Sequence, residues 1–277
     1  MTATPNKLPL WQWILLFIGA TFLSFIGYAA IMGGYELTHV FGLPVLTIVC
    51  AAIILVIYAV LVRALEKHWP TNLPLHNAIP HTLLGILIGF IFMVLVVSSI
   101  VASGCAAVSW KGFSDEGQFN MLMLFLAVAV GEEIVCRGVI FRLIDERWNT
   151  WVALLVSALL FGWMHISNDN ATWWSSLAIA IEAGLLLGAA YKWSGNLWVP
   201  IGIHWAWNYT QGNIFGLAVS GANTNETILA TTVGGPDIIT GGAFGPEASI
   251  ITVILGTFLT LVFLANRYRR SSNNRNY

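Results

Sequence analysis

The sequence has very few charged residues. Only 9% of its 277 residues are Asp, Glu, Lys or Arg, whereas a typical soluble domain has about 25%. Hydrophobic residues make up 57% of the chain, and the mean hydropathy is +0.78. Twelve basic and 13 acidic residues cannot cover the surface of a water-soluble globule of this length. The composition therefore predicts an integral membrane protein, with residues 1–277 forming a single membrane domain.

Other features are also scarce, and each shortage excludes a class of protein. A net charge of −1 leaves no basic surface for nucleic acid, so no nucleic-acid partner is expected. The three cysteines, Cys50, Cys105 and Cys136, are too few and too scattered for a disulfide framework or a cysteine metal site. No serine lies in a Gly-x-Ser-x-Gly motif, which argues against an α/β-hydrolase nucleophile.

Long apolar runs dominate the chain instead. A helix needs roughly 20 apolar residues to cross the hydrocarbon core of a bilayer. The runs that approach this length are Leu10–Met32, Leu43–Val62, Thr82–Gly104, Phe119–Ile140, Trp151–Ile166, Trp173–Tyr191, Leu197–Val219 and Ala248–Ala265. The sequence thus predicts an all-α polytopic membrane protein, a bundle of about eight transmembrane helices.

The basic residues orient this bundle, because Lys and Arg are retained on the cytoplasmic side. With the N-terminus inside, ten basic residues fall in inner segments and only Lys111 in an outer one, while Arg137 lies within a span. Both termini are therefore expected in the cytoplasm of a multi-pass protein of the cell membrane. The segment 220–247, rich in Gly and Thr, is expected to be an outer loop whose role the sequence does not indicate.

Ionisable residues inside a span are expensive, at about 2.5–3.5 kcal/mol each on insertion scales, and so indicate function. Glu132, Glu133 and Arg137 lie together on the fourth predicted span. Glu133 and Arg137 are four residues apart, which suits an ion pair on one helix face. Glu132 points about 100° away and is left free to meet another helix. The alternative is a purely structural ion-pair cluster that holds helices together.

Polar residues on other spans could complete a site. His165 lies near the end of the fifth span, and His204 and Asn208 share one face of the seventh. An imidazole beside a carboxamide can hold a developing oxyanion, although hydrogen bonding between helices is the alternative role. Glu182, on the sixth span, has no basic partner within four residues and is a second-tier candidate. A carboxylate, two histidines and an asparagine together could activate water against an amide carbonyl.

The order of these motifs resembles a known family. Glu-Glu-x-x-x-Arg, Phe-x-x-x-His and His-x-x-x-Asn, on the fourth, fifth and seventh spans, are similar to the CPBP family of intramembrane proteases, named for CAAX proteases and bacteriocin-processing enzymes. The resemblance covers the catalytic motif region, residues 119–213, and the Gly241–Glu247 stretch resembles the outer loop of bacterial members. It implies a CAAX-protease-like endopeptidase, in a bacterial cytoplasmic membrane, that hydrolyses a peptide bond of a membrane-associated protein or peptide precursor.

The resemblance also implies roles for individual residues. Glu132 would activate the hydrolytic water and His165 would help to hold it, whereas Glu133 and Arg137 would support them. His204 and Asn208 would stabilise the oxyanion. No metal cofactor is expected, because the sequence has no His-Glu-x-x-His motif. The alternative is a zinc-dependent protease with Glu132, His165 and His204 as the ligands, since two histidines and a glutamate form a known catalytic zinc set.

Two functions other than proteolysis stay open. A non-catalytic immunity or scaffold protein would bind its target without cutting it. A transporter is disfavoured because no internal repeat is visible.

The predicted depths of the two histidines differ. His165 lies about 21 Å into the fifth span and His204 only about 10 Å into the seventh, at 1.5 Å per residue. The site therefore requires the fifth helix to be tilted or to end within the bundle.

Overall fold

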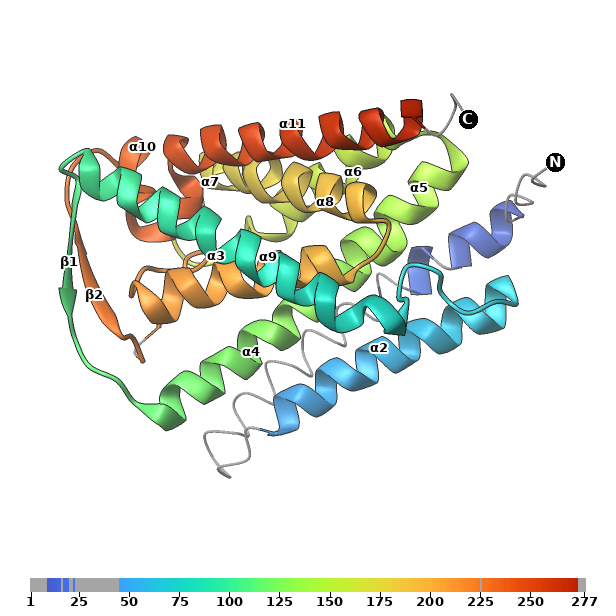
Figure 1. Ribbon diagram of the computed structural model, residues 1–277, viewed down its shortest axis with the longest axis horizontal. Coiled ribbons are helices and arrows are strands. Elements are labelled where there is room, and N and C mark those ends of the chain that lie inside the picture. Colours follow the sequence, from blue (N-terminus) through green and yellow to red (C-terminus); the bar gives the residue numbers. More distant parts are fainter. Residues whose placement is uncertain (1–8, 16, 20–21, 23–44, 225, 274–277) are drawn as a thin grey trace.

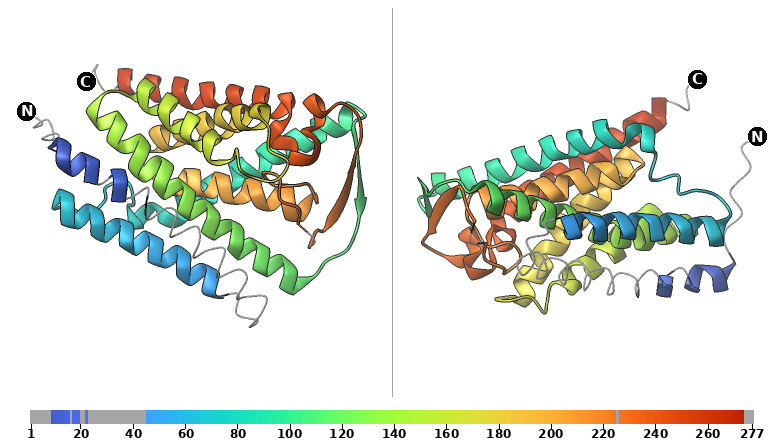
Figure 2. Two further views of the ribbon diagram at one scale, coloured as in Figure 1. Left: turned by 180° about the vertical axis from the view of Figure 1, so that it is seen from behind. Right: turned by 90° about the horizontal axis from the view of Figure 1, so that it is seen from below.

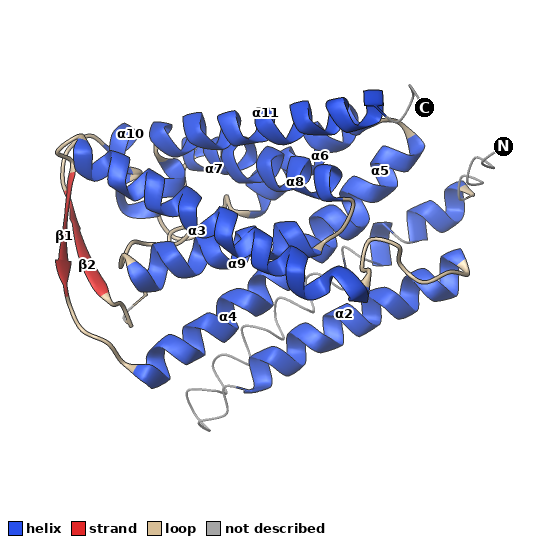
Figure 3. Cartoon of the chain, in the orientation of Figure 1, coloured by secondary structure: helices blue, strands red, loops and turns tan. Residues whose placement is uncertain are grey.

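The computed structural model describes residues 9–15, 17–19, 22, 45–224 and 226–273. In this part of the chain the fold is a helical bundle with one small sheet at one end (Figures 1 and 3). The all-α prediction is therefore right for the bundle and wrong for this sheet. The helices and strands are α2 (Val45–Glu66), η1 (Leu75–Asn77), α3 (Ala78–Ala102), β1 (Ala106–Trp110), α4 (Asp115–Glu133), η2 (Ile134–Phe141), α5 (Arg142–Arg147), α6 (Thr150–Met164), α7 (Trp173–Ile179), η3 (Ala180–Leu185), α8 (Leu186–Ser194), α9 (Trp198–Tyr209), η4 (Thr210–Ile214), β2 (Leu229–Val233), α10 (Asp237–Thr240), η5 (Gly242–Phe244), η6 (Pro246–Ala248) and α11 (Ile250–Asn273).

Within the described residues, five helices are long and apolar enough to cross a membrane. They are Leu46–Glu66, Leu75–Ala102, Asp115–Arg147, Trp173–Ser194 and Ile250–Arg267, and each coincides with a span predicted from the sequence. Several apolar helices of this length make the chain a multi-pass membrane protein. Most of the first predicted span, Leu10–Met32, lies outside the described residues.

The remaining two predicted spans differ from the helices observed. The fifth corresponds to α6, which has only 15 residues. The seventh ends at Ile214, not at Val219. It ends there because Gly216 adopts a left-handed backbone conformation, with φ of 68°, and because Asn213 turns its side-chain amide to the carbonyl of Glu226, 2.7 Å away.

The sheet joins two segments that were both predicted to lie outside the membrane. β1 and β2 are antiparallel, with Ala106 opposite Val233 and Trp110 opposite Leu229. Five residue pairs fix this register. They hold residues 220–224 and 226–247, hereafter called the outer segment, against the connection between α3 and α4 at one end of the bundle (Figure 3).

Charged residues gather at the opposite end of the bundle. Arg142 pairs with Glu66 at 2.6 Å, and Lys192 pairs with Asp145. The guanidinium of Arg267 donates to the carbonyl of Lys192. Figure 2 shows the ends of α2, α5, α8 and α11 on this side, away from the strands. All the basic residues in these contacts belong to segments predicted to lie on one side of the membrane.

Small residues allow the helices to approach closely, as is typical of membrane bundles. A β-carbon at Gly85 would lie 2.3 Å from the carbonyl oxygen of Val199, and one at Gly202 would lie 2.3 Å from that of Thr82. Glycines on both α3 and α9 therefore keep these two helices in backbone contact. Because α9 carries His204 and Asn208, this contact fixes the position of the site residues relative to α3.

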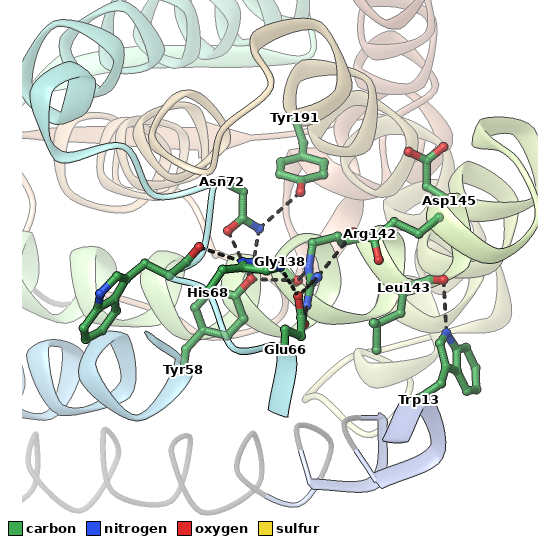
Figure 4. A network of polar contacts seen from close by, with 12 residues as sticks. Trp13, Tyr58, Glu66, His68, Asn72, Gly138, Arg142, Leu143, Asp145 and Tyr191 are labelled. Carbon is green, nitrogen blue, oxygen red and sulfur yellow. Dashed lines mark hydrogen bonds and ion pairs between the residues drawn. The ribbon is translucent and has the colours of Figure 1, made fainter. Parts of the chain in front are cut away.

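A buried polar network anchors the helix that carries the two adjacent glutamates (Figure 4). The Tyr58 hydroxyl donates to the carbonyl of Gly138 at 2.9 Å and accepts from the Asn72 amide at 2.9 Å. Asn72 also donates to the Tyr191 hydroxyl at 3.2 Å. Arg142 Nε donates to the same Gly138 carbonyl at 2.9 Å. The carbonyl of Gly138 in η2 thus accepts from α2 and α5, and Asn72 extends the network from Tyr58 to Tyr191 of α8.

We expect Tyr58→Phe to lower the free energy of unfolding by about 1–3 kcal/mol, because Asn72 would lose a partner in a buried site. Reversible unfolding of the purified protein in detergent would measure the loss. Ser99→Ala is the control, since the Ser99 hydroxyl is exposed and bonds only within its own helix. Equal stabilities of the Tyr58→Phe variant and the wild type would contradict this role of the network.

Candidate active site

The two adjacent glutamates lie where one long helix changes its winding. Residues Asp115–Arg147 form a continuous helix, whose first turn is capped by the Ser114 hydroxyl, the acceptor for Gly117 N–H. The segment η2 that follows Glu133 is a π-helix. Such wider turns are rare and occur frequently at functional sites. Here the change in winding separates Glu132 and Glu133 from the anchored carbonyl of Gly138.

Glu133 and Arg137 form the ion pair that their spacing predicts. Glu133 Oε1 and Arg137 Nη1 are 2.7 Å apart, and both side chains are completely buried. Arg137 Nη2 also donates to the carbonyls of Ala183 and Gly184, at 3.3 and 3.2 Å. The guanidinium carbon lies 4.5 Å from the centre of the Phe161 ring. Arg137 therefore joins three helical segments around one buried positive charge.

His204 links the two glutamates from α9. Its Nδ1 lies 3.1 Å from Glu133 Oε1, and its Nε2 lies 3.9 Å from Glu132 Oε2. Because an ionised carboxylate only accepts hydrogen bonds, Nδ1–H is the donor to Glu133. This bond directs Nε2 toward Glu132.

Glu132 is less constrained than its neighbour. Its side chain is 15% exposed, whereas that of Glu133 is fully buried. Glu132 Oε2 has no hydrogen-bond partner among the residues that the structure describes. A buried carboxylate oxygen without a protein partner requires an explanation, such as a water or a ligand at that point. Glu133 Oε2 likewise has no partner among the described residues, but Glu133 Oε1 is bonded to both Arg137 and His204. Glu132 is thus the more accessible and less tightly held of the two glutamates beside His204.

Phe161 brings His165 to the same place. α6 ends at Met164, and His165 is buried directly after it. This helix therefore ends inside the bundle, as the different predicted depths of His165 and His204 require. His165 Nδ1 lies 2.7 Å from the carbonyl of Phe161, and the two rings are 4.9 Å apart. The Phe161 ring also meets the His204 ring at 6.0 Å, edge to face. Both imidazoles therefore contact one aromatic ring that also stacks on Arg137.

Asn208 is the last of the residues that the motifs single out. It is buried on α9, one turn beyond His204, so the two side chains share a helix face. The intervening Trp207 points elsewhere, since its indole N–H donates to Gln211 at 3.0 Å and its ring packs on Phe92. The structure thus brings together Glu132, Glu133, Arg137 and His204 by direct contact and His165 through Phe161, with Asn208 alongside.

Two further buried carboxylates lie near this group. Glu182 is completely buried in η3, and neither of its oxygens has a hydrogen-bond partner among the described residues. Glu247, in η6, accepts hydrogen bonds from the Ser220 amide at 2.5 Å and the Ser220 hydroxyl at 3.1 Å. The sequence predicts an outer loop at Glu247 and gives no direct indication that its carboxylate is buried. The signal that could have found it is a glutamate within a run of Gly, Ala, Phe and Pro, where an apolar surrounding is expected.

Burial raises the pKa of Glu247 above its ordinary value. Hydrogen bonds from Ser220 and Gln211 oppose this increase, as does the electrostatic interaction with His165. That interaction connects Glu247 to the residues of the three motifs.

The arrangement of these side chains also bears on metal binding. Within the described part of the chain, no three His, Cys, Asp or Glu side chains are grouped so that they could hold a metal ion.

The fold and this group of residues define a multi-pass membrane protein with a buried Glu/His/Arg/Asn site. Comparison with known proteins agrees: residues 116–210 match the family described as Type II CAAX prenyl endopeptidase Rce1-like. The resemblance read from the three motifs is thus confirmed for this region of the chain, which is similar to a CAAX-type protease family.

One curated relative is the Uncharacterized protein YpbD of Bacillus subtilis (strain 168), which is 30% identical over 94 residues. The match covers 34% of this chain and 44% of the relative, so the chain spans less than half the length of that protein. No solved structure matches the chain.

We expect Arg137→Met to lower the free energy of unfolding by about 3–5 kcal/mol, because it leaves the Glu133 carboxylate buried without its counter-charge. Thermal unfolding in detergent would measure the change. Arg63→Met, at an exposed arginine of α2, is the control. The double variant Glu133→Gln/Arg137→Met should lose less than Arg137→Met alone. An additive loss in the double variant would contradict a direct charge interaction.

Proposed function

We propose that the chain is an intramembrane endopeptidase that hydrolyses peptide bonds with a water activated by Glu132. The observation that carries this proposal is the difference between two adjacent glutamates. Glu133 Oε1 is bonded to Arg137 at 2.7 Å and to His204 at 3.1 Å, whereas Glu132 lies 3.9 Å from His204 Nε2 and its side chain is 15% exposed. A carboxylate with free bonding capacity in a largely dry site is suited to general-base catalysis. The match to a CAAX-type protease family supports the same reaction class.

In the proposed reaction, Glu132 takes one proton from a water that His165 also contacts. The water oxygen bonds to the carbonyl carbon of the scissile peptide, and the negative charge that develops on the carbonyl oxygen is stabilised by His204 and Asn208. The carbon–nitrogen bond then breaks, and the proton held by Glu132 passes to the leaving nitrogen. Glu133 and Arg137 keep the imidazole of His204 oriented, through the 3.1 Å contact between Glu133 and Nδ1.

We propose further that the chain crosses a bacterial cytoplasmic membrane about eight times, with both termini in the cytoplasm. The clustering of Glu66, Arg142, Asp145, Lys192 and Arg267 at one end of the bundle supports this orientation, because basic residues are retained inside. The substrate would be a membrane-associated protein or a peptide precursor that reaches the site from the bilayer.

The principal test is a comparison of peptides from membranes and culture medium of cells that express the wild type or Glu132→Gln. Peptides released only by the wild type would identify a protease, and their ends would define the cleavage site. Glu116→Gln, the same change at an exposed position of α4, is the matched control. Identical peptide profiles for the wild type and Glu132→Gln would instead favour a membrane protein that binds its target without cutting it.

With a released peptide in hand, Glu132→Gln should reduce kcat by at least about 10²-fold, because general-base catalysis contributes about 10²–10⁴-fold. Asn208→Ala should reduce kcat by about 10²–10³-fold, the usual cost of losing one oxyanion donor. An unchanged kcat in Asn208→Ala would remove this residue from the mechanism.

We also propose that catalysis is independent of a metal ion, since a carboxylate base and two oxyanion donors supply the reaction without one. Dialysis of the purified enzyme against 1,10-phenanthroline should leave its activity unchanged. Zinc measured by mass spectrometry should be far below one ion per chain. Loss of activity on dialysis with recovery on added zinc would establish the zinc-dependent alternative, with Glu132, His165 and His204 as its ligands.

A further inference from the structure

Ser220, at the start of the outer segment, makes three hydrogen bonds to other parts of the chain. Its amide and hydroxyl donate to the two oxygens of the Glu247 carboxylate, and its carbonyl accepts from the Asn168 side chain at 2.9 Å. Ser220 has φ of 48°, an uncommon value for a residue other than glycine. Such a conformation persists only when the surrounding contacts determine it. Ser220 therefore links two parts of the chain by specific bonds.

One of these two parts is the turn that follows His165. Asn168 and Asn170 both lie in this turn, and both direct side-chain amides to the backbone carbonyls of Ser220 and Gly221, at 2.9 and 3.5 Å. The backbone of Gly221 lies against Asp169, so closely that a β-carbon at Gly221 would be 1.8 Å from the Asp169 carbonyl oxygen. The turn after α6 is thus held against the outer segment at Ser220 and Gly221.

The other part carries Glu247 itself. Gly221 N–H donates to the Phe244 carbonyl at 2.8 Å, which fixes the short turns before Glu247. The Glu247 carboxylate is only 4% exposed and interacts electrostatically with His165. A charge in so buried a place is costly unless it is paired or hydrogen-bonded. Ser220 supplies the hydrogen bonds to the carboxylate. Asn168, whose side chain donates to Ser220, donates its own backbone N–H to the His165 carbonyl at 3.2 Å.

We propose that Glu247 is a positioning residue for His165: through Ser220 and Asn168, its carboxylate holds the turn after α6 in place and keeps the imidazole in the site. The proposal rests on the proposed function, because it assigns His165 a place in the reaction. It gives the outer segment a role that its sequence does not indicate. Imidazoles in catalytic sites depend on such a group to keep the ring in its productive orientation.

The experiment measures His165 itself, apart from any activity. Purified wild type, Glu247→Gln, Glu247→Asp and Asn168→Ala would be treated with diethyl pyrocarbonate in detergent, and modification of His165 followed by mass spectrometry relative to exposed His76. Asp237→Asn, the same carboxylate-to-amide change at an exposed position of the outer segment, is the matched control. Glu247→Gln should raise the modification rate of His165 severalfold, Asn168→Ala should raise it less, and Glu247→Asp should restore most of the protection.

Turnover of a released peptide provides the second measurement. Glu247→Gln should lower kcat by about 10- to 100-fold, as displacement of a catalytic group by a distant change does. KM should stay close to the wild-type value, because the substrate contacts are unchanged. Glu247→Asp should recover much of kcat.

The outcomes separate this proposal from the proposed function. Unchanged His165 reactivity in both Glu247→Gln and Asn168→Ala would overturn the positioning role, whatever the activity. An equal rise in Asp237→Asn would also overturn it, because the effect would then come from the segment as a whole. Increased His165 reactivity in a chain that cleaves no peptide would support the link between Glu247 and His165 while the proposed function failed. If Glu247→Gln does not fold, Asn168→Ala decides the question alone.

Discussion

The buried ion pair between Glu133 and Arg137 is the interaction on which the rest of the site depends. Two charges removed from water carry a desolvation cost that their attraction offsets only when further hydrogen bonds satisfy the remaining groups. Here those groups come from three directions: carbonyls of η3, the ring of Phe161 on α6 and the imidazole of His204 on α9. These contacts bring three helices together on α4 and η2, although Glu133 Oε2 and Arg137 Nε have no hydrogen-bond partner among the described residues. The same convergence places Glu132 beside His204, so the site follows from the requirement to neutralise one arginine inside a membrane.

The difference between Glu132 and Glu133 has a simple geometric origin. Adjacent residues on a helix point about 100° apart, so only one of the two can share a face with Arg137 and accept from His204 Nδ1. The other is turned toward less crowded surroundings, and the 15% exposure of its side chain reflects this. One dipeptide thus supplies both a buried structural anion and a more accessible carboxylate. The π-helical turn that follows allows Gly138 to direct its carbonyl to Tyr58 and Arg142, so the anchor of the helix is separate from its reactive part.

The parts of this structure that the sequence predicts are those that depend on short separations along the chain. The Glu133–Arg137 pair spans one helical turn, and most of the apolar runs coincide with the long helices within a few residues. The parts it does not predict are formed by contacts between distant residues. The β1–β2 sheet pairs positions about 120 residues apart along the chain, and the bond between Ser220 and Glu247 joins residues 27 apart within an irregular segment. Tyr58, Asn72 and Gly138 carry no local pattern that indicates their network, because each is an ordinary residue of an apolar helix or a connecting segment.

The two ends of the bundle hold the site by different means, and the difference has a physical reason. At the charged end, the ion pairs of Arg142 and Lys192 add to the buried bonds around Tyr58 and join helices that are already long. At the other end, α6 and α9 stop short, with His165 and Asn208 near their ends, and the backbone groups beyond them need partners because a bilayer offers no water to replace a missing hydrogen bond. The outer segment bonds to these helix ends. Asn168 and Asn213 donate their side-chain amides to the carbonyls of Ser220 and Glu226, and Ile228 N–H donates to the Asn213 carbonyl at 2.8 Å. A site built on helix ends inside a membrane therefore requires a covering segment that bonds to it, and this requirement explains why the outer segment is hydrogen-bonded to the bundle at Ser220 and Glu226 and is buried at residues 244–247.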